Sequence, residues 1–132
     1  MRVIVTGSRD WGYPELVGRA LYGYWSMCRA MDHPMILRHG GCNTGADAAA
    51  EEWYQSRPPG TEGLTRELFP ADWSQGRIAG PIRTVQMFAD QIDMVLAFWD
   101  GKSRGTGYAV KLATERNVPL LIRFSPSSMN AL

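Results

Sequence analysis

Three short apolar runs in this chain each end in a Gly-bearing polar turn that leads into a segment with helical periodicity. The turns occupy residues 6–11, 39–45 and 100–106. Repetition of strand, turn and helix is typical of an α/β fold with a parallel sheet. Glycine lets a ligand approach the main chain, and the first N–H groups of a helix lack intrahelical partners. The pattern therefore predicts a pocket for a phosphate-bearing molecule at one edge of such a sheet.

Strands and helices are expected to alternate strictly along the chain. Strands are predicted at residues 2–6, 35–38, 66–69, 93–99 and 119–123, with helices that begin near residues 14, 44, 81 and 106. Right-handed crossovers then give a doubly wound, mainly parallel five-stranded sheet with helices on both faces. We expect one domain over residues 1–124 and a flexible C-terminal tail over residues 125–132. Ligands bind such sheets outside the carboxyl ends of the strands.

Two local patterns give more detailed expectations for the helices. Residues 44–47 match a capping box, with Asp47 in the place of the usual Glu, so a local capping bond explains Asp47. In the third helix, which Pro81 is expected to open, apolar spacing predicts inward-facing side chains. These are Ile82, Val85, Ala89 and Ile92.

Composition excludes several classes of protein. The chain has 132 residues, of which 45% are hydrophobic and 20% charged, and its net charge of +1 provides no basic field for nucleic acid. No apolar run approaches the roughly 20 residues of a membrane span. Cys28 and Cys42 lack metal-ligand spacing and are interpreted as thiols, with Cys42 the more exposed. The chain enters a strand directly, without a signal peptide, so we expect a cytoplasmic protein.

Basic and small polar residues dominate the predicted ligand side. Arginine offers a fork of donors that suits phosphate oxygens, and a helix start attracts anions. Arg83 and Arg104 are favoured as ligand contacts, whereas Arg77 carries a weaker signal. For Lys102, ligand contact and solvated surface charge are equally favoured. The predicted ligand-binding residues are Gly7, Ser8, Arg9, Asp10, Gly40, Gly41, Asp72, Arg83, Gly101, Ser103, Arg104, Gly105 and Thr106.

Two Asp-Trp pairs, at residues 10–11 and 72–73, allow two interpretations each. The carboxylates either accept ribose hydroxyls or cap a helix, and the indoles either stack on a base or fix their loops to the core. For Trp73 the second role is favoured. His39 ends a strand and is interpreted as structural, and no group of residues suggests a metal site.

The turns also carry a family likeness. In order, they resemble the motifs of the YspA-like, cpYpsA-related branch of the SLOG superfamily over about residues 3–119. The matching segments are Gly7-Ser8-Arg9-Asp10-Trp11, His39-Gly40-Gly41 with Gly45-Ala46-Asp47, Phe69-Pro70-Ala71-Asp72-Trp73, Ala79-Gly80-Pro81-Ile82-Arg83 with Met87, and Ser103-Arg104-Gly105-Thr106. Each motif alone is weak, but five in order are specific.

This resemblance implies a Rossmann-like fold and a site for a nucleotide or a nucleotide-derived ligand. The superfamily includes lysine-decarboxylase-like phosphoribohydrolases and DNA-processing protein A. Arg83 and Met87 match the Arg-x-x-x-Met element of the phosphoribohydrolases. The Glu of their second element is replaced by Ala109, which follows Tyr108, and neither residue supplies a carboxylate.

The hypothesis favoured by these observations is binding of a nucleotide-like small molecule, with no certain cofactor. One alternative is an N-glycosidic hydrolase acting on a nucleoside monophosphate, in which Arg83 orients the phosphate and Asp10 or Asp72 replaces the missing Glu. A second is a nucleic-acid-binding module, which the near-neutral charge disfavours. Aromatic side chains on several faces of the first helix, Tyr22, Tyr24 and Trp25 with Met27, favour a homodimer.

Overall fold

A computed structural model describes residues 1–126 of the chain. The tail predicted over residues 125–132 therefore lies outside the described residues from position 127 on. Strands and helices alternate as expected: β1 (Arg2–Gly7), α1 (Pro14–Ala30), β2 (Met35–His39), α2 (Gly45–Gln55), β3 (Leu64–Leu68), a 3₁₀ helix η1 (Trp73–Ile78), α3 (Ala79–Met87), β4 (Met94–Trp99), α4 (Arg104–Glu115) and β5 (Leu120–Phe124). Within this part of the chain, none of the helices has the length and apolarity needed to cross a bilayer.

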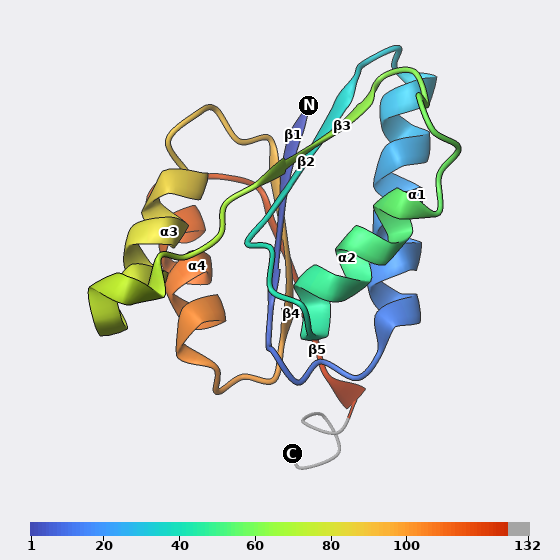
Figure 1. The fold of residues 1–132 in the computed structure, drawn as a ribbon. Helices are drawn as coiled ribbons and strands as arrows, with labels where there is room; N and C mark the ends of the chain where they lie inside the picture. The colour runs from blue at the N-terminus through green and yellow to red at the C-terminus, as the bar shows by residue number, and fades with distance from the viewer. Residues whose placement is uncertain (127–132) are drawn as a thin grey trace.

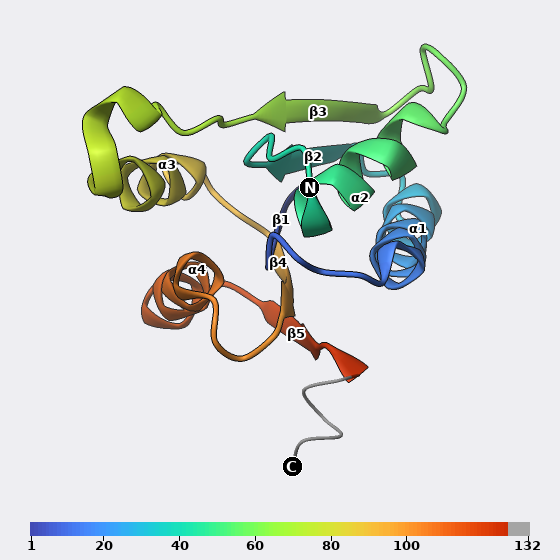
Figure 2. The ribbon, with the colours of Figure 1, turned by 60° about the horizontal axis from the view of Figure 1, so that its bottom comes forward.

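The sheet contains five parallel strands in the order β3-β2-β1-β4-β5. Helices α1 and α2 cover one face, and α3 and α4 cover the other (Figure 1). Figure 2 shows α3 and α4 side by side on the face opposite α1 and α2. From β1 the chain adds β2 and then β3 on one side of the sheet, and it then returns to place β4 on the other side of β1. The carboxyl ends of β1 and β4 therefore form the switch point at which doubly wound sheets bind ligands.

Alternation along β1 divides the core into two layers. Val3 and Val5 are fully buried under α1 and α2, whereas Ile4 points to the opposite layer. In that second layer Ala109 and Leu112 of α4 pack as their spacing predicts. Both faces of the central strands are thus covered, which explains why β1 and β4 are almost continuously apolar.

Helix α3 differs from its prediction. It begins at Ala79, directly after η1, so Pro81 lies inside its first turn and does not open it. Ile82 and Val85, expected to face inward, are 37% and 41% exposed, whereas Thr84 and Met87 are buried. Thr84 donates its hydroxyl to the carbonyl of Gly80 at 3.0 Å, which satisfies a polar group on the inward face. Apolar spacing alone did not indicate that a threonine would face the core.

A buried cation, Arg38, fastens β2 to the segment after α3. Its side chain is 1% exposed and donates to Glu67 at 2.9 Å, to the Met87 carbonyl at 2.7 Å and to Asp90. The guanidinium also lies 4.7 Å from the centre of the Phe69 ring. Because the donors are paired, the burial of this charge is tolerated.

At the β5 edge of the sheet, the residue that follows β5 is also held in place. Ser125 N donates to the Trp99 carbonyl at 3.0 Å.

Candidate functional site

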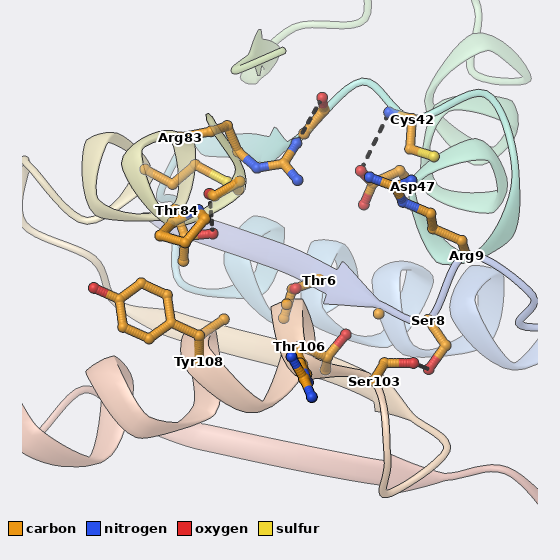
Figure 3. Close-up of a pocket in the computed structure, with 18 of the residues that line it drawn as sticks. Thr6, Ser8, Arg9, Cys42, Asp47, Arg83, Thr84, Ser103, Thr106 and Tyr108 are labelled. Atoms are coloured by element: carbon orange, nitrogen blue, oxygen red, sulfur yellow. Dashed lines mark hydrogen bonds between the residues drawn. The ribbon is translucent and has the colours of Figure 1, made fainter. Parts of the chain in front are cut away.

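A cleft of about 820 Å³ opens at the carboxyl ends of β1 and β4 (Figure 3). Its walls come from the end of β1, the turn between β2 and α2, helix α3 and the start of α4. The predicted ligand-binding residues line this cleft, with the exception of Gly41, Asp72 and Gly101. Arg77 also lines it, whereas Lys102 does not. Arg83 and Gly105, far apart in sequence, thus share one cavity.

The N-terminus of α4 presents unpaired hydrogen-bonding groups to this cleft. Ser103 is the N-cap residue but makes no side-chain capping bond, and the N–H groups of residues 104–106 have no partner among residues 1–126. Thr106 is only 3% exposed, and its hydroxyl also has no hydrogen-bond partner in that range. Space remains open around Gly105, where a Cβ would meet no atom within 4 Å. Unpaired amides at a helix start are suited to bind an anion.

The turn before α4 is held in place by hydrogen bonds of its own. Asp100 accepts from Lys102 N at 2.8 Å and from Ser103 N at 2.7 Å. Burial acts to raise the pKa of Asp100, but these N–H bonds and the hydroxyls of Ser103 and Ser8 outweigh it and hold the pKa below its usual value. Ser8, which is 1% exposed, accepts from Asp100 N at 3.2 Å and from the Ser103 hydroxyl at 3.1 Å. The turns after β1 and β4 are therefore joined at the base of the cleft.

Gly45 lets α2 approach the turn after β1. Its φ of +68° lies in the left-handed region, and a Cβ there would come 2.2 Å from the Ser8 carbonyl oxygen. One residue later, Ala46 N reaches the same oxygen at 3.4 Å. Only glycine fits this position, so the start of α2 forms a fixed wall of the cleft.

Arg83 is oriented by backbone carbonyls on neighbouring segments. Its Nη1 donates to the Gly40 oxygen at 3.1 Å and to the Phe69 oxygen at 3.4 Å. Its Nε and Nη2 make no hydrogen bond to any residue from 1 to 126. One nitrogen thus fixes the guanidinium while the others stay available to a ligand in the cleft.

Asp47 has a different role from the predicted one. Thr44 is the N-cap residue of α2, but its side chain makes no capping bond, so the expected capping box is wrong. Asp47 instead reaches back and accepts from Cys42 N at 3.3 Å (Figure 3). Its side chain is buried at 9% exposure and lines the cleft. Burial raises the pKa of Asp47, an effect larger than the opposing influence of His39, Arg83 and the backbone N–H groups of Cys42 and Gly40.

The two Trp residues of the Asp-Trp pairs behave differently. Trp11 is buried at 6% exposure and packs edge-on against Phe98, which fixes its loop to the core. Trp73 was expected to do the same, but it is 54% exposed and lines the cleft. The guanidinium of Arg9 lies 5.0 Å from the centre of its ring. Trp73 begins η1, whose short 3₁₀ turn keeps it away from the core.

The carboxylates next to these two Trp residues also lie in different places. Asp10 is exposed and lines the cleft. Asp72 lies outside the cleft and caps η1, where it accepts from Ser74 N at 3.2 Å. Hydrogen bonds from Ser74 and Gln75 lower the pKa of Asp72. The two carboxylates therefore do not face each other across one cavity.

His39 lies behind the cleft wall and is structural, as predicted. Gly41 N donates to its Nδ1 at 3.0 Å, so the ring proton resides on Nε2, which donates to Glu51 at 2.8 Å. The imidazole is 1% exposed and does not line the cleft. Cys28 is buried and Cys42 partly exposed, and both are free thiols. Among residues 1–126, no three His, Cys, Asp or Glu side chains are grouped to hold a metal ion.

Comparison with known proteins agrees with the motifs that surround the cleft. Residues 1–76 match the model of the YspA, cpYpsA-related SLOG family. The chain belongs to this SLOG family. It is also 32% identical to the Gene 61 protein of Mycobacterium phage D29 over 121 residues, which cover 91% of this chain and 94% of the relative. No solved structure matches the chain.

Ala109, which the resemblance to the phosphoribohydrolases places at their glutamate position, lines the cleft and is 1% exposed. Tyr108 beside it also lines the cleft and is half-buried. The acidic groups that do line the cleft are Asp10, Asp47 and Asp100. Asp47, the buried one, was missed as a site residue because its local sequence pattern suggested a helix cap.

Proposed function

We propose that this protein binds a nucleotide or a nucleotide-derived small molecule in the cleft. The observation that carries the proposal is the start of α4, where the N–H groups of residues 104–106 and the Thr106 hydroxyl face the cavity without a partner among the described residues. A phosphate group placed there would accept hydrogen bonds from these donors and would be favoured by the helix dipole. Membership of the SLOG family supports a nucleotide-related ligand.

The remaining walls suit the other parts of such a ligand. Arg83 offers two unpaired guanidinium nitrogens, and Arg104 lies beside the proposed phosphate position. Trp73, exposed at the rim and accompanied by Arg9, provides a flat surface on which a base can stack. We expect the protein to act in the cytoplasm, where such ligands are abundant.

Thermal denaturation with a panel of ligands tests the proposal. The panel contains the four nucleoside 5′-monophosphates, NAD and ADP-ribose, with the matching nucleosides as phosphate-free controls. A ligand at a hundredfold excess over its dissociation constant should stabilise the protein by about 2.7 kcal/mol. We expect stabilisation by phosphate-bearing ligands and little by the nucleosides. A panel without any shift at millimolar concentration would contradict the proposal.

A matched pair of variants tests where the ligand binds. Arg83→Gln removes the fixed guanidinium of the cleft. Arg19→Gln removes the same charge from an exposed position on α1 that does not line the cleft. The first variant should lose most of the ligand-induced shift, and the second should retain it. Equal loss in both would indicate attraction by net charge only.

We also propose that the protein is a homodimer. On α1, Tyr24 and Trp25 are buried in the core, but Tyr22 and Met27 are 57% and 41% exposed. These two side chains are available for contact with a second copy. Light scattering coupled to size exclusion should give twice the mass of 14.7 kDa. A monomer at micromolar concentration would refute this part of the proposal.

A further inference from the structure

The cleft contains an imbalance between hydrogen-bond donors and acceptors. Its unpaired groups among the described residues include the first amides of α4 and two guanidinium nitrogens of Arg83, all of which are donors. Arg9, Arg77 and Arg104 add further donors along the walls. The oxygens of an anion can accept hydrogen bonds from these donors, but an anion without hydroxyl or N–H groups offers no donor to an acidic residue in the wall.

Asp47 is the acceptor that this arrangement does not explain. It is a carboxyl group at 9% exposure that lines the cleft and forms no ion pair within the described part of the chain. Arg83 and Asp47 face the same side of Gly40, where a Cβ would come 2.0 Å from Arg83 Nη1 and 2.9 Å from Asp47 Oδ2. Burying a carboxyl group is costly unless hydrogen bonds compensate it. Cys42 N supplies one such bond, at 3.3 Å.

The other carboxylates of the cleft are less suited to contact a ligand. Asp100 accepts from Lys102 N and Ser103 N and is committed to its own turn. Asp10 is exposed, so water satisfies it. Asp47 therefore is the buried acceptor that a bound molecule can reach.

We propose that Asp47 selects ligands by accepting hydrogen bonds from the ribose hydroxyls, so that the cleft binds ribonucleotides and discriminates against 2′-deoxyribonucleotides. This inference rests on the proposed function. A ribonucleotide offers phosphate oxygens to the donors of α4 and Arg83 and a vicinal diol to the buried carboxylate of Asp47. A site that hydrogen-bonds a ligand hydroxyl rejects the analogue that lacks it, because its own polar group is then buried without a partner.

The test compares AMP with dAMP by calorimetry on the full chain. The wild type should bind AMP at least about tenfold more tightly than dAMP, as expected for the loss of a hydrogen bond to a charged group. In Asp47→Ala, which removes the acceptor oxygens, the preference should fall to about twofold or less. Asp32→Asn, which changes an exposed carboxylate outside the cleft, should keep the wild-type preference.

The outcomes separate this inference from the proposed function. Binding of neither nucleotide by the wild type would refute the proposed function. Equal affinity of the wild type for AMP and dAMP would refute the role of Asp47, and so would a preference that survives in Asp47→Ala. If Asp47→Ala does not fold, a comparison of AMP with 2′-O-methyl-AMP in the wild type replaces it: the methylated ligand cannot donate from that position, so equal affinity for the two would overturn the inference.

Discussion

Arg83 lies so close to Gly40 that a Cβ on the glycine would come 2.0 Å from Arg83 Nη1. The same atom donates to the Gly40 carbonyl at 3.1 Å. A side chain at position 40 would therefore displace the guanidinium from the carbonyls that orient it. Because position 40 has no side chain, the Arg83 guanidinium can reach the Gly40 carbonyl, although the two residues are 43 positions apart in the sequence.

Gly40→Ala should lower both ligand affinity and stability. The added methyl group forces Arg83 out of its position, and the loss of its hydrogen bonds costs about 1–3 kcal/mol. Calorimetry with the best ligand of the panel and thermal denaturation measure the two effects. Gly23→Ala is the matched control, because a Cβ there meets nothing within 4 Å. In the middle of α1 this change should stabilise by about 0.5–1 kcal/mol. Unchanged affinity in Gly40→Ala would show that the position of Arg83 is unimportant for binding.

Asp47→Asn should stabilise the unliganded protein at neutral pH. Burial raises the pKa of Asp47 above its ordinary value of 3.8, so the folded state prefers the protonated carboxyl. The stability that this group contributes is present below pH 3.8 and is lost as the pH rises through the higher pKa of the folded state. Asparagine does not ionise and avoids this loss.

Melting curves between pH 3.5 and pH 8 measure the difference. We expect the variant to melt about 1–5 °C higher than the wild type at pH 7–8 and the gap to close in acid. Asp10→Asn should follow the wild type throughout. A destabilised Asp47→Asn at neutral pH would show that the ionised carboxylate is needed to hold the 40–42 turn.

Trp73→Ala should weaken nucleotide binding but leave the stability of the fold nearly unchanged. The indole is 54% exposed, so its removal should change the free energy of unfolding by less than about 1 kcal/mol. A base that stacks on it would lose about 1–3 kcal/mol of binding free energy. Trp11→Ala, in contrast, removes a side chain at 6% exposure and should destabilise the protein by about 3–5 kcal/mol. Nucleotide affinity that is unchanged in Trp73→Ala would exclude the stacking surface.

The sequence was sufficient to predict the alternation of strands and helices and the parallel sheet, but not every contact at the cleft. Alternating apolar runs and Gly-bearing turns predict the parallel sheet, because each local signal agrees with the same fold. Trp73 was misjudged because its partner, Arg9, comes from a different loop. Asp47 was misjudged because its bond to Cys42 N depends on the conformation of the turn before α2. The inward-facing Thr84 carries no apolar signal, so the face of α3 was also assigned wrongly.

Acid should destabilise the folded protein, because protonation of Asp90 and Glu67 removes their ion pairs with Arg38. The hydrogen bond and charge of Arg38 lower the pKa of Asp90. For Glu67, burial acts to raise the pKa, but bonds and charges from Arg38 and Arg2 outweigh it and the pKa is lowered from 4.5. Groups with lowered pKa values stabilise the fold above their ordinary pKa, and this contribution is lost as the pH falls through the folded value.

Arg38→Met should therefore flatten the fall in melting temperature below about pH 4.5. Lys111→Met is the control, since its pair with Glu115 is exposed on both sides at 67% and 56% and contributes little. An equally steep acid transition in Arg38→Met and the wild type would show that other carboxylates govern acid stability.

The central claim is that main-chain amides at the start of α4 bind the phosphate of a nucleotide, and amide NMR of the isotopically labelled protein tests it most directly. During titration with AMP, the amide signals of Gly105 and Thr106 should show the largest shifts, with smaller shifts at residues 40–42 and none in the middle of α1. Saturable shifts that leave Gly105 and Thr106 unmoved, or no shifts at all, would contradict the account.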